Sequence, residues 1–308
     1  MSLWLDLLTQ FRGPIGFTRG EIAHAEPTAV ASLAMLAWDP ARFAATLERN
    51  EAWLAERQQP DGSIAPNEQL TEPGWASSWA LLELAARRAQ VRFIPPSTTT
   101  INAASAIDWM LGIKGVPLDR SPTLGHDSSL IGWPWVAKTH TWLEPTCLAV
   151  MALKAHGYAD HPRTLEGMRI VKDRLLPRGG ANYGNTFVLG QQLLPHLQPT
   201  GLALMALAGT ADDNGYQAAA RAYLLRELPI LPGASSLAYG ILGLHAHGIE
   251  LPEVDGLLQA AAERVLRRDT SPYRLALLCW AAWAIEQPPG TIWPGNILQS
   301  AELTAVPA

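Results

Sequence analysis

One short phrase recurs along this chain: a proline followed by an apolar run rich in alanine and leucine. It reads EPTAVASLAML from residue 26, EPTCLAVMAL from residue 144 and QPTGLALMAL from residue 198, with looser copies that begin near residues 72, 234 and 271. Proline is favoured at the first position of a helix, where its missing N–H costs nothing. Because these runs carry very few charges, the repeat predicts six helices that are buried on all sides.

Segments of a different kind alternate with these phrases. Most carry apolar residues at spacings of three and four with charges on the opposite face, which is the pattern of an amphipathic surface helix. They span residues 2–11, 39–59, 100–112, 162–176, 214–228 and 252–268. The alternation predicts an all-α fold, an α/α toroid of about six helical hairpins with an inner and an outer helical ring. We expect one toroid domain over residues 1–298 and a C-terminal tail over residues 299–308.

In such a toroid, every connection from an outer to an inner helix lies at the same end. These connections are the long ones, and they span residues 12–26, 60–72, 113–144 and 177–198. Long loops on a rigid scaffold are a common place for functional residues. We therefore expect the mouth of the barrel to be formed mainly by the third and fourth of these loops.

Composition narrows the class of protein. The net charge is -5 and the basic residues are scattered, so nothing in the sequence indicates nucleic-acid binding. Cys147 and Cys279 lie inside apolar helical runs and do not indicate a disulfide framework. The N-terminus lacks the basic start of a signal peptide, and no uncharged run is long enough to span a membrane. These features predict a cytoplasmic protein.

Two turns carry a motif that resembles a known one. QQPDGSI from residue 58 and WAIEQPPGTIW from residue 283 resemble the Gln-Trp repeat of squalene-hopene and oxidosqualene cyclases, with Ile64 where the repeat has tryptophan. Together with the Pro-Thr helix starts, they make residues 26–298 resemble the prenyltransferase and squalene-cyclase-like toroid superfamily. In that motif the glutamine bonds a helix end and the tryptophan stacks on it. We therefore expect Gln59, Gln287 and Trp293 to be structural staples.

The resemblance implies a function. It implies an atypical terpenoid cyclase or prenyltransferase-like enzyme that binds an isoprenoid or another apolar ligand in its barrel, uses no cofactor and contacts membranes peripherally. Class II terpene cyclases begin an inner helix with DxDDTA, whose middle aspartate donates a proton. Aligned on that phrase, Glu144 takes the place of the acid, while Trp142 and Pro145 replace the other aspartates. The chain thus resembles a divergent, single-toroid member of the superfamily that lacks DxDD.

A structural interpretation of Glu144 stays open beside the chemical one. Glu26 and Glu72 occupy the same place before a proline, and Gln198 fills it without a charge. An acid there stabilises the positive end of the helix dipole by about 0.3–1 kcal/mol. What distinguishes Glu144 is the loop that precedes it.

That loop supplies most of the remaining candidates for the site. Tryptophan faces near a carbocation stabilise it by about 0.5–2 kcal/mol each, and acids or histidines near Glu144 would replace the lost aspartates. We expect the catalytic groups to be Asp127, His140 and Glu144, and the ligand-binding wall to be Trp133, Trp135, Trp142, Asn182 and Tyr183.

Other functions also fit parts of the sequence. No tight spacing of histidine and cysteine ligands is present, so we expect no metal site. A non-catalytic toroid, acting as a scaffold or partner-binding module, would explain the lost aspartates and predicts a barrel plugged by its own side chains. A glycan-active enzyme on an (α/α)6 barrel would need two opposed carboxylates, for which Asp127 and Glu144 are the candidates.

Overall fold

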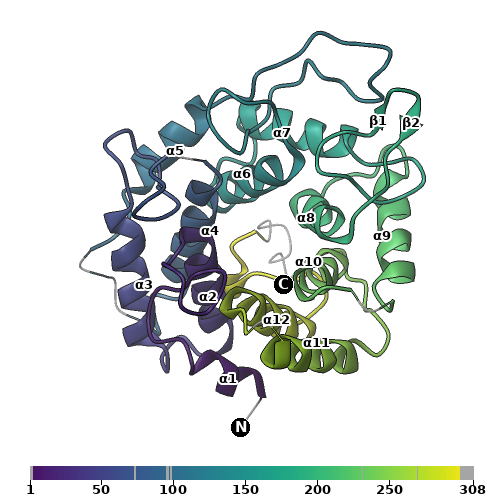
Figure 1. Ribbon diagram of the computed structural model, residues 1–308. Coiled ribbons are helices and arrows are strands. Elements are labelled where there is room, and N and C mark those ends of the chain that lie inside the picture. The colour runs from purple at the N-terminus through teal and green to yellow at the C-terminus, as the bar shows by residue number, and fades with distance from the viewer. Residues whose placement is uncertain are drawn as a thin grey trace, which may run out of the picture.

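The structure, a computed structural model, describes residues 3–72, 74–94, 97, 99–230, 232–268 and 270–298. Within these residues the helices form two concentric rings (Figure 1). The inner ring consists of α2 (Ala25–Trp38), α4 (Ala76–Ala89), α6 (Leu143–Ala155), α8 (Leu197–Leu207), α10 (Ala234–His245) and α12 (Pro272–Ile285). The outer ring consists of α1 (Leu3–Leu8), α3 (Ala44–Glu56), α5 (Ala103–Gly112), α7 (Pro162–Asp173), α9 (Tyr216–Glu227) and α11 (Val254–Arg268).

The inner ring is closed. Each inner helix packs against the next one in the chain, and α12 packs against α2. This arrangement confirms the predicted α/α toroid. The predicted C-terminal tail, residues 299–308, lies outside the described residues. None of the helices in the described part combines the length and the apolar character that crossing a membrane requires.

The inner helices are buried because they carry almost no charge. In α8 every residue from Pro199 to Leu207 is buried, and in α6 every residue from Leu143 to Leu153. These helices begin two residues before the repeated proline rather than at it. Proline is tolerated at the third position because the first four N–H groups of a helix have no partner inside the helix. The residue before the proline therefore lies within the first turn.

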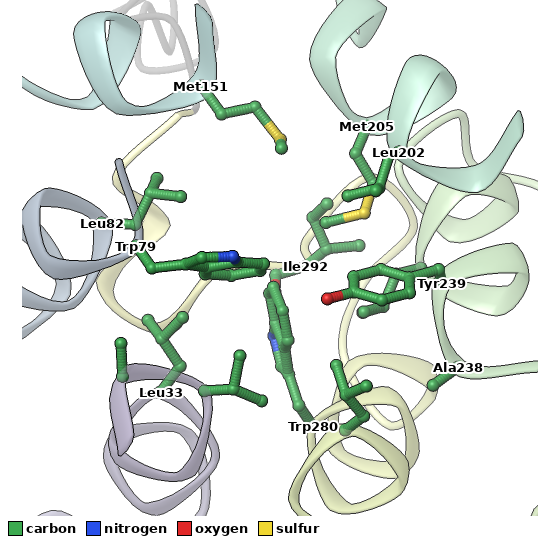
Figure 2. Packing of buried hydrophobic residues seen from close by; sticks show 14 of the residues in the cluster. Leu33, Trp79, Leu82, Met151, Leu202, Met205, Ala238, Tyr239, Trp280 and Ile292 are labelled. Atoms are coloured by element: carbon green, nitrogen blue, oxygen red, sulfur yellow. The ribbon is translucent and has the colours of Figure 1, made fainter. Parts of the chain in front are cut away.

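The axis of the barrel is filled by large side chains. Figure 2 shows Trp79, Met151, Met205, Tyr239 and Trp280 pointing toward one another from five inner helices. The ring centroids of Trp79 and Trp280 are 6.4 Å apart in an edge-on contact, and both side chains are 0% exposed. Trp293, in the turn after α12, packs at a tilt against Trp280, with ring centroids 4.9 Å apart. These contacts form an apolar floor beneath the mouth.

The first Gln-Trp-like turn works through a different glutamine from the one expected. Gln58, not Gln59, joins two hairpins: its amide nitrogen donates to the Asn102 carbonyl at 2.9 Å, and its oxygen accepts from the Asn102 N–H at 2.8 Å. Asn102 caps α5. Gln59 instead donates to the Thr71 carbonyl and holds its own loop.

The long loops all lie at the N-terminal ends of the inner helices, as predicted. The fourth of them contains a small feature that the sequence did not indicate, an antiparallel pair of strands, β1 (Phe187–Val188) and β2 (Gln191–Gln192). The third is fastened to the outer ring by Arg163. Its guanidinium donates to the carbonyls of Ile113 and Ile131 and lies 4.3 Å over the ring of Trp133.

Candidate functional site

Six side chains, one from or directly before each inner helix, surround the axis at the mouth. Four of them are the second residue of their helix, one precedes α4 directly, and one lies a turn inside α10. We call this group the mouth ring: Glu26, Trp75, Glu144, Gln198, Tyr239 and Tyr273. The helices bring them together because every inner helix starts at the same end of the toroid.

One arc of the mouth ring is a continuous line of hydrogen bonds. The Trp75 indole donates to Oε2 of Glu26 at 2.7 Å, and the Tyr273 hydroxyl donates to Oε1 at 2.8 Å. The Tyr273 and Tyr239 hydroxyls are 3.0 Å apart. Burial raises the pKa of Glu26, and the Tyr273 and Trp75 donors partly offset that rise. This arc joins α4, α2, α12 and α10.

The other arc consists of Glu144 and Gln198. The Gln198 amide donates to Oε1 of Glu144 at 3.2 Å. Glu144 is only 5% exposed, and burial raises its pKa to about 7, with a further rise from the charge of Glu26 and an offset from Gln198. A substantial fraction of Glu144 therefore holds its proton at neutral pH. Glu72, which shares its sequence context, is exposed in the loop before α4.

Two tyrosines lie within reach of these charges. Burial raises the pKa of Tyr239 well above its ordinary value, and the charges of Glu26 and Glu144 raise it further. The pKa of Tyr183 is raised by burial and by the charge of Glu144, and its ring packs at a tilt against that of His196, with centroids 5.1 Å apart. The charges of both glutamates thus act on Tyr239, and that of Glu144 acts on Tyr183.

The three loop tryptophans lie in different places. Trp135 makes an edge-on contact with Trp75 of the mouth ring, at 5.2 Å. Trp142 is the residue before α6 and is 36% exposed. Trp133 is 3% exposed, donates its N–H to the Met110 carbonyl at 2.9 Å and fastens the loop to α5. Trp135 therefore contacts the mouth ring, Trp142 lies at the start of α6, and Trp133 is a packing residue.

Asp127 lies apart from the mouth ring in a pair with Arg120. Its carboxylate accepts hydrogen bonds from the Arg120 guanidinium and from the Ser129 hydroxyl, the latter at 2.6 Å. These donors hold the pKa of Asp127 far below its ordinary value. The group therefore stays ionised, which does not suit a proton donor.

His140 is exposed and lines a side pocket rather than the mouth ring. This pocket, of about 270 Å³, is also lined by Trp142, His126 and Arg174. Burial lowers the pKa of His126 to about 4, with a smaller contribution from Arg174. His126 is therefore neutral at physiological pH.

Asn182 has its hydrogen-bonding groups satisfied within the fourth loop. It donates to the Leu194 carbonyl at 2.7 Å, and its Oδ1 accepts the Tyr183 N–H, also at 2.7 Å. Over the described ranges of the chain, no group of three or more histidine, cysteine or carboxylate side chains is arranged to hold a metal ion.

Sequence reasoning did not assign a functional role to most of the mouth ring. Glu26 and Gln198 are copies of the Glu144 position, and that pattern by itself indicates only a helix start. Trp75 follows the repeated proline of its copy by two residues and Tyr273 follows its proline directly, which is the signal that would have found them. Nothing in the sequence singles out Tyr239.

Comparisons with known proteins agree with this architecture. No family model matches the sequence, and no curated protein matches it. A reducing-end xylose-releasing exo-oligoxylanase is similar in structure at 12% identity and a TM-score of 0.56, over 94% of this chain and 91% of that one. A type II terpene cyclase, MstE from Scytonema, solved with geranylgeranyl dihydroxybenzoate, is similar at 15% identity and a TM-score of 0.47, over 86% and 81%.

The likeness to the oligoxylanase shows the fold, an α/α toroid, and at this identity it shows the fold alone. Any chemistry at the mouth therefore depends on the residues of the mouth ring.

Proposed function

We propose that this protein is an enzyme that protonates its ligand at the toroid mouth, with Glu144 as the general acid. The setting of Glu144 carries the proposal. A glutamate that only stabilises a helix start is expected to be solvated and to have a lowered pKa. Glu144 is instead 5% exposed, receives one hydrogen bond from Gln198 and has a pKa raised to about 7. General acids work best when their pKa lies near the working pH.

The surroundings of Glu144 favour an isoprenoid or another apolar, unsaturated ligand. Protonation of a double bond creates a carbocation, which aromatic faces stabilise by about 0.5–2 kcal/mol each. The mouth ring offers Trp75, Tyr239 and Tyr273, and the floor below it is apolar and closed by Trp79 and Trp280. The ligand then lies at the mouth, above this floor, rather than deep in the barrel. The reaction class is that of an atypical terpenoid cyclase.

Glycoside hydrolysis is a second candidate, favoured by the presence of two carboxyl groups in the mouth ring. Glycosidases pair a protonated acid with an ionised carboxylate. Glu144 suits the first role, and Glu26, which accepts hydrogen bonds from Trp75 and Tyr273, suits the second. Asp127, the partner that the sequence offered, is committed to Arg120.

Product formation by the wild type and by Glu144→Gln tests the proposal. Both proteins are incubated with squalene, oxidosqualene and polyprenols, and separately with xylo-oligosaccharides, and products are followed by mass spectrometry. Glu72→Gln is the matched control, because Glu72 precedes a proline in the same repeat but is exposed. We expect product from one substrate class, lost in Glu144→Gln and kept in Glu72→Gln.

The pH dependence supplies a second readout. Because the acid must be protonated, the rate should fall as the pH rises above about 7, the pKa of Glu144. Product from the oligosaccharides would favour glycoside hydrolysis. If neither substrate class gives product or binds, the proposal is contradicted and the scaffold alternative remains.

A further inference from the structure

The two glutamates of the mouth ring occupy equivalent places and have different surroundings. Glu26 is the second residue of α2 and Glu144 the second residue of α6. Both oxygens of Glu26 accept a hydrogen bond, at 2.7 and 2.8 Å, whereas Glu144 accepts one at 3.2 Å. Donors aimed at a carboxylate stabilise its ionised form. When the pair holds a single proton, that proton therefore resides on Glu144.

We propose that Glu26 is a positioning residue of this site: it carries the ionised charge of the pair and thereby keeps the proton on Glu144. Tyr273 and Trp75 hold the Glu26 carboxylate in place, and Tyr239 supports Tyr273 from α10. The inference rests on the proposed function, in which Glu144 is the acid. Glu26 itself need not touch the ligand, because it acts through its charge.

The charges around the pair agree with this assignment. The charge of Glu26 raises the pKa of Glu144, and no lysine or arginine among the described residues contributes to the pKa of either group. The charge of Glu144 raises the pKa values of Tyr183, Tyr239 and Cys147, so these groups stay neutral. Two like charges in one site resist simultaneous ionisation, here with Glu144 buried and Glu26 partly buried. The pair is therefore expected to lose its protons in two separate steps.

A merely structural role for Glu26 has to be distinguished from this one. Its hydrogen bonds join α2 to α12 and to the loop before α4, so its loss also weakens the mouth. A drop in activity would not separate the two roles. The pKa of Glu144 separates the two roles when Glu26→Gln is compared with Glu26→Asp. Loosening of the mouth would hydrate Glu144 and lower its pKa in both variants, whereas the charge is lost only in Glu26→Gln.

The experiment follows the Glu144 carboxyl by NMR of the full chain with ¹³C-labelled glutamate, without any ligand, between pH 4 and 9. The Glu144 signal is assigned from its absence in Glu144→Gln. In Glu26→Gln, which keeps the size and removes the charge, we expect the midpoint of Glu144 to fall by roughly one pH unit. In Glu26→Asp, which keeps the charge, the midpoint should stay closer to the wild-type value.

Two further variants sharpen the result. Tyr273→Phe removes one donor from Glu26 and should raise the pH at which Glu26 ionises, a change opposite in sign to that of Glu144 in Glu26→Gln. Tyr158→Phe, at an exposed tyrosine outside the mouth ring, should change neither titration.

An unchanged or raised Glu144 midpoint in Glu26→Gln would overturn the inference. So would a Glu144 midpoint that falls equally in Glu26→Asp, because that variant retains the charge. The titration needs no substrate, so its outcome is separate from that of the proposed function. If Glu144→Gln retains full turnover while Glu26→Gln shifts the midpoint, the coupling stands and the proposed catalytic role fails.

Discussion

Glu83 permits a sharp prediction about stability. It lies in α4, is 0% exposed, and neither of its carboxyl oxygens has a hydrogen-bond partner within the described residues. Its pKa is raised to about 8 by burial and then by the charge of Glu51, with a partial offset from Arg87. In the unfolded chain the same group titrates near its ordinary value of 4.5. The folded protein therefore holds a proton that the unfolded chain releases.

The size of the effect on stability follows from the difference between the folded and unfolded pKa values of Glu83. Because the pKa of Glu83 is higher in the folded than in the unfolded state, its contribution to the free energy of unfolding is fully present below pH 4.5. That contribution is lost as the pH rises toward 8. The full loss corresponds to about 5 kcal/mol of unfolding free energy. Glu83→Gln keeps the shape and cannot ionise, so it avoids this loss. We expect it to lie within about 1 kcal/mol of the wild type at pH 4 and to be more stable by roughly 3–5 kcal/mol at pH 8.

Urea unfolding followed by circular dichroism, at several pH values from 4 to 8.5, measures the difference. The control is Glu48→Gln, at an exposed glutamate of α3, for which the difference from the wild type should stay within about 0.5 kcal/mol. The reasoning is refuted if the advantage of Glu83→Gln is the same at both ends of the pH range. It is also refuted if the variant is less stable at pH 8, because Glu83 would then be an ionised partner of Arg87.

Three further changes test the packing, all read from denaturant midpoints or proteolysis. Trp280→Ala removes the centre of the axis cluster and should cost about 3–5 kcal/mol; a cost under 1 kcal/mol would mean that the axis is not tightly packed. Gly201→Ala places a methyl group 2.2 Å from the Tyr239 carbonyl, so it should destabilise the protein by about 1–3 kcal/mol or more, and a neutral result would contradict the close approach of α8 to α10. Arg163→Lys loses the fork that fastens the third loop, and it should speed cleavage within residues 113–142 but not within the fourth loop.

Local composition was enough to predict the rings. A helix whose charges are confined to its ends has no face that prefers water, so α2, α6 and α8 had to be inner helices whatever their neighbours were. The polar-faced segments had to cover them, and the predicted range 252–268 became α11 (Val254–Arg268). The alternation of the two kinds also determined which loops share an end. These features depend on residues close together in the chain.

The mouth ring depends on closure of the toroid, which local patterns do not encode. Tyr273 and Glu26 are separated by 247 residues and meet only because α12 packs against α2. Whether a side chain at a helix start faces the axis also depends on the rotation of that helix. A shift of one residue is enough to change the outcome, as Gln58 and Gln59 show at the first Gln-Trp-like turn.

The residue before the repeated proline can stabilise a helix start or act as a buried acid, and the sizes of the dipole and burial effects on its pKa decide which role applies. An acid at a helix N-terminus gains about 0.3–1 kcal/mol from the dipole, which favours the ionised form. For Glu144, the rise in pKa from 4.5 to about 7 corresponds to about 3 kcal/mol in the opposite direction. For Glu144 the effect of burial exceeds that of the helix dipole because the closed ring excludes water there. Glu72, in the loop before α4, remains exposed. The chemistry of the position is thus determined by closure of the toroid around it rather than by the residue type.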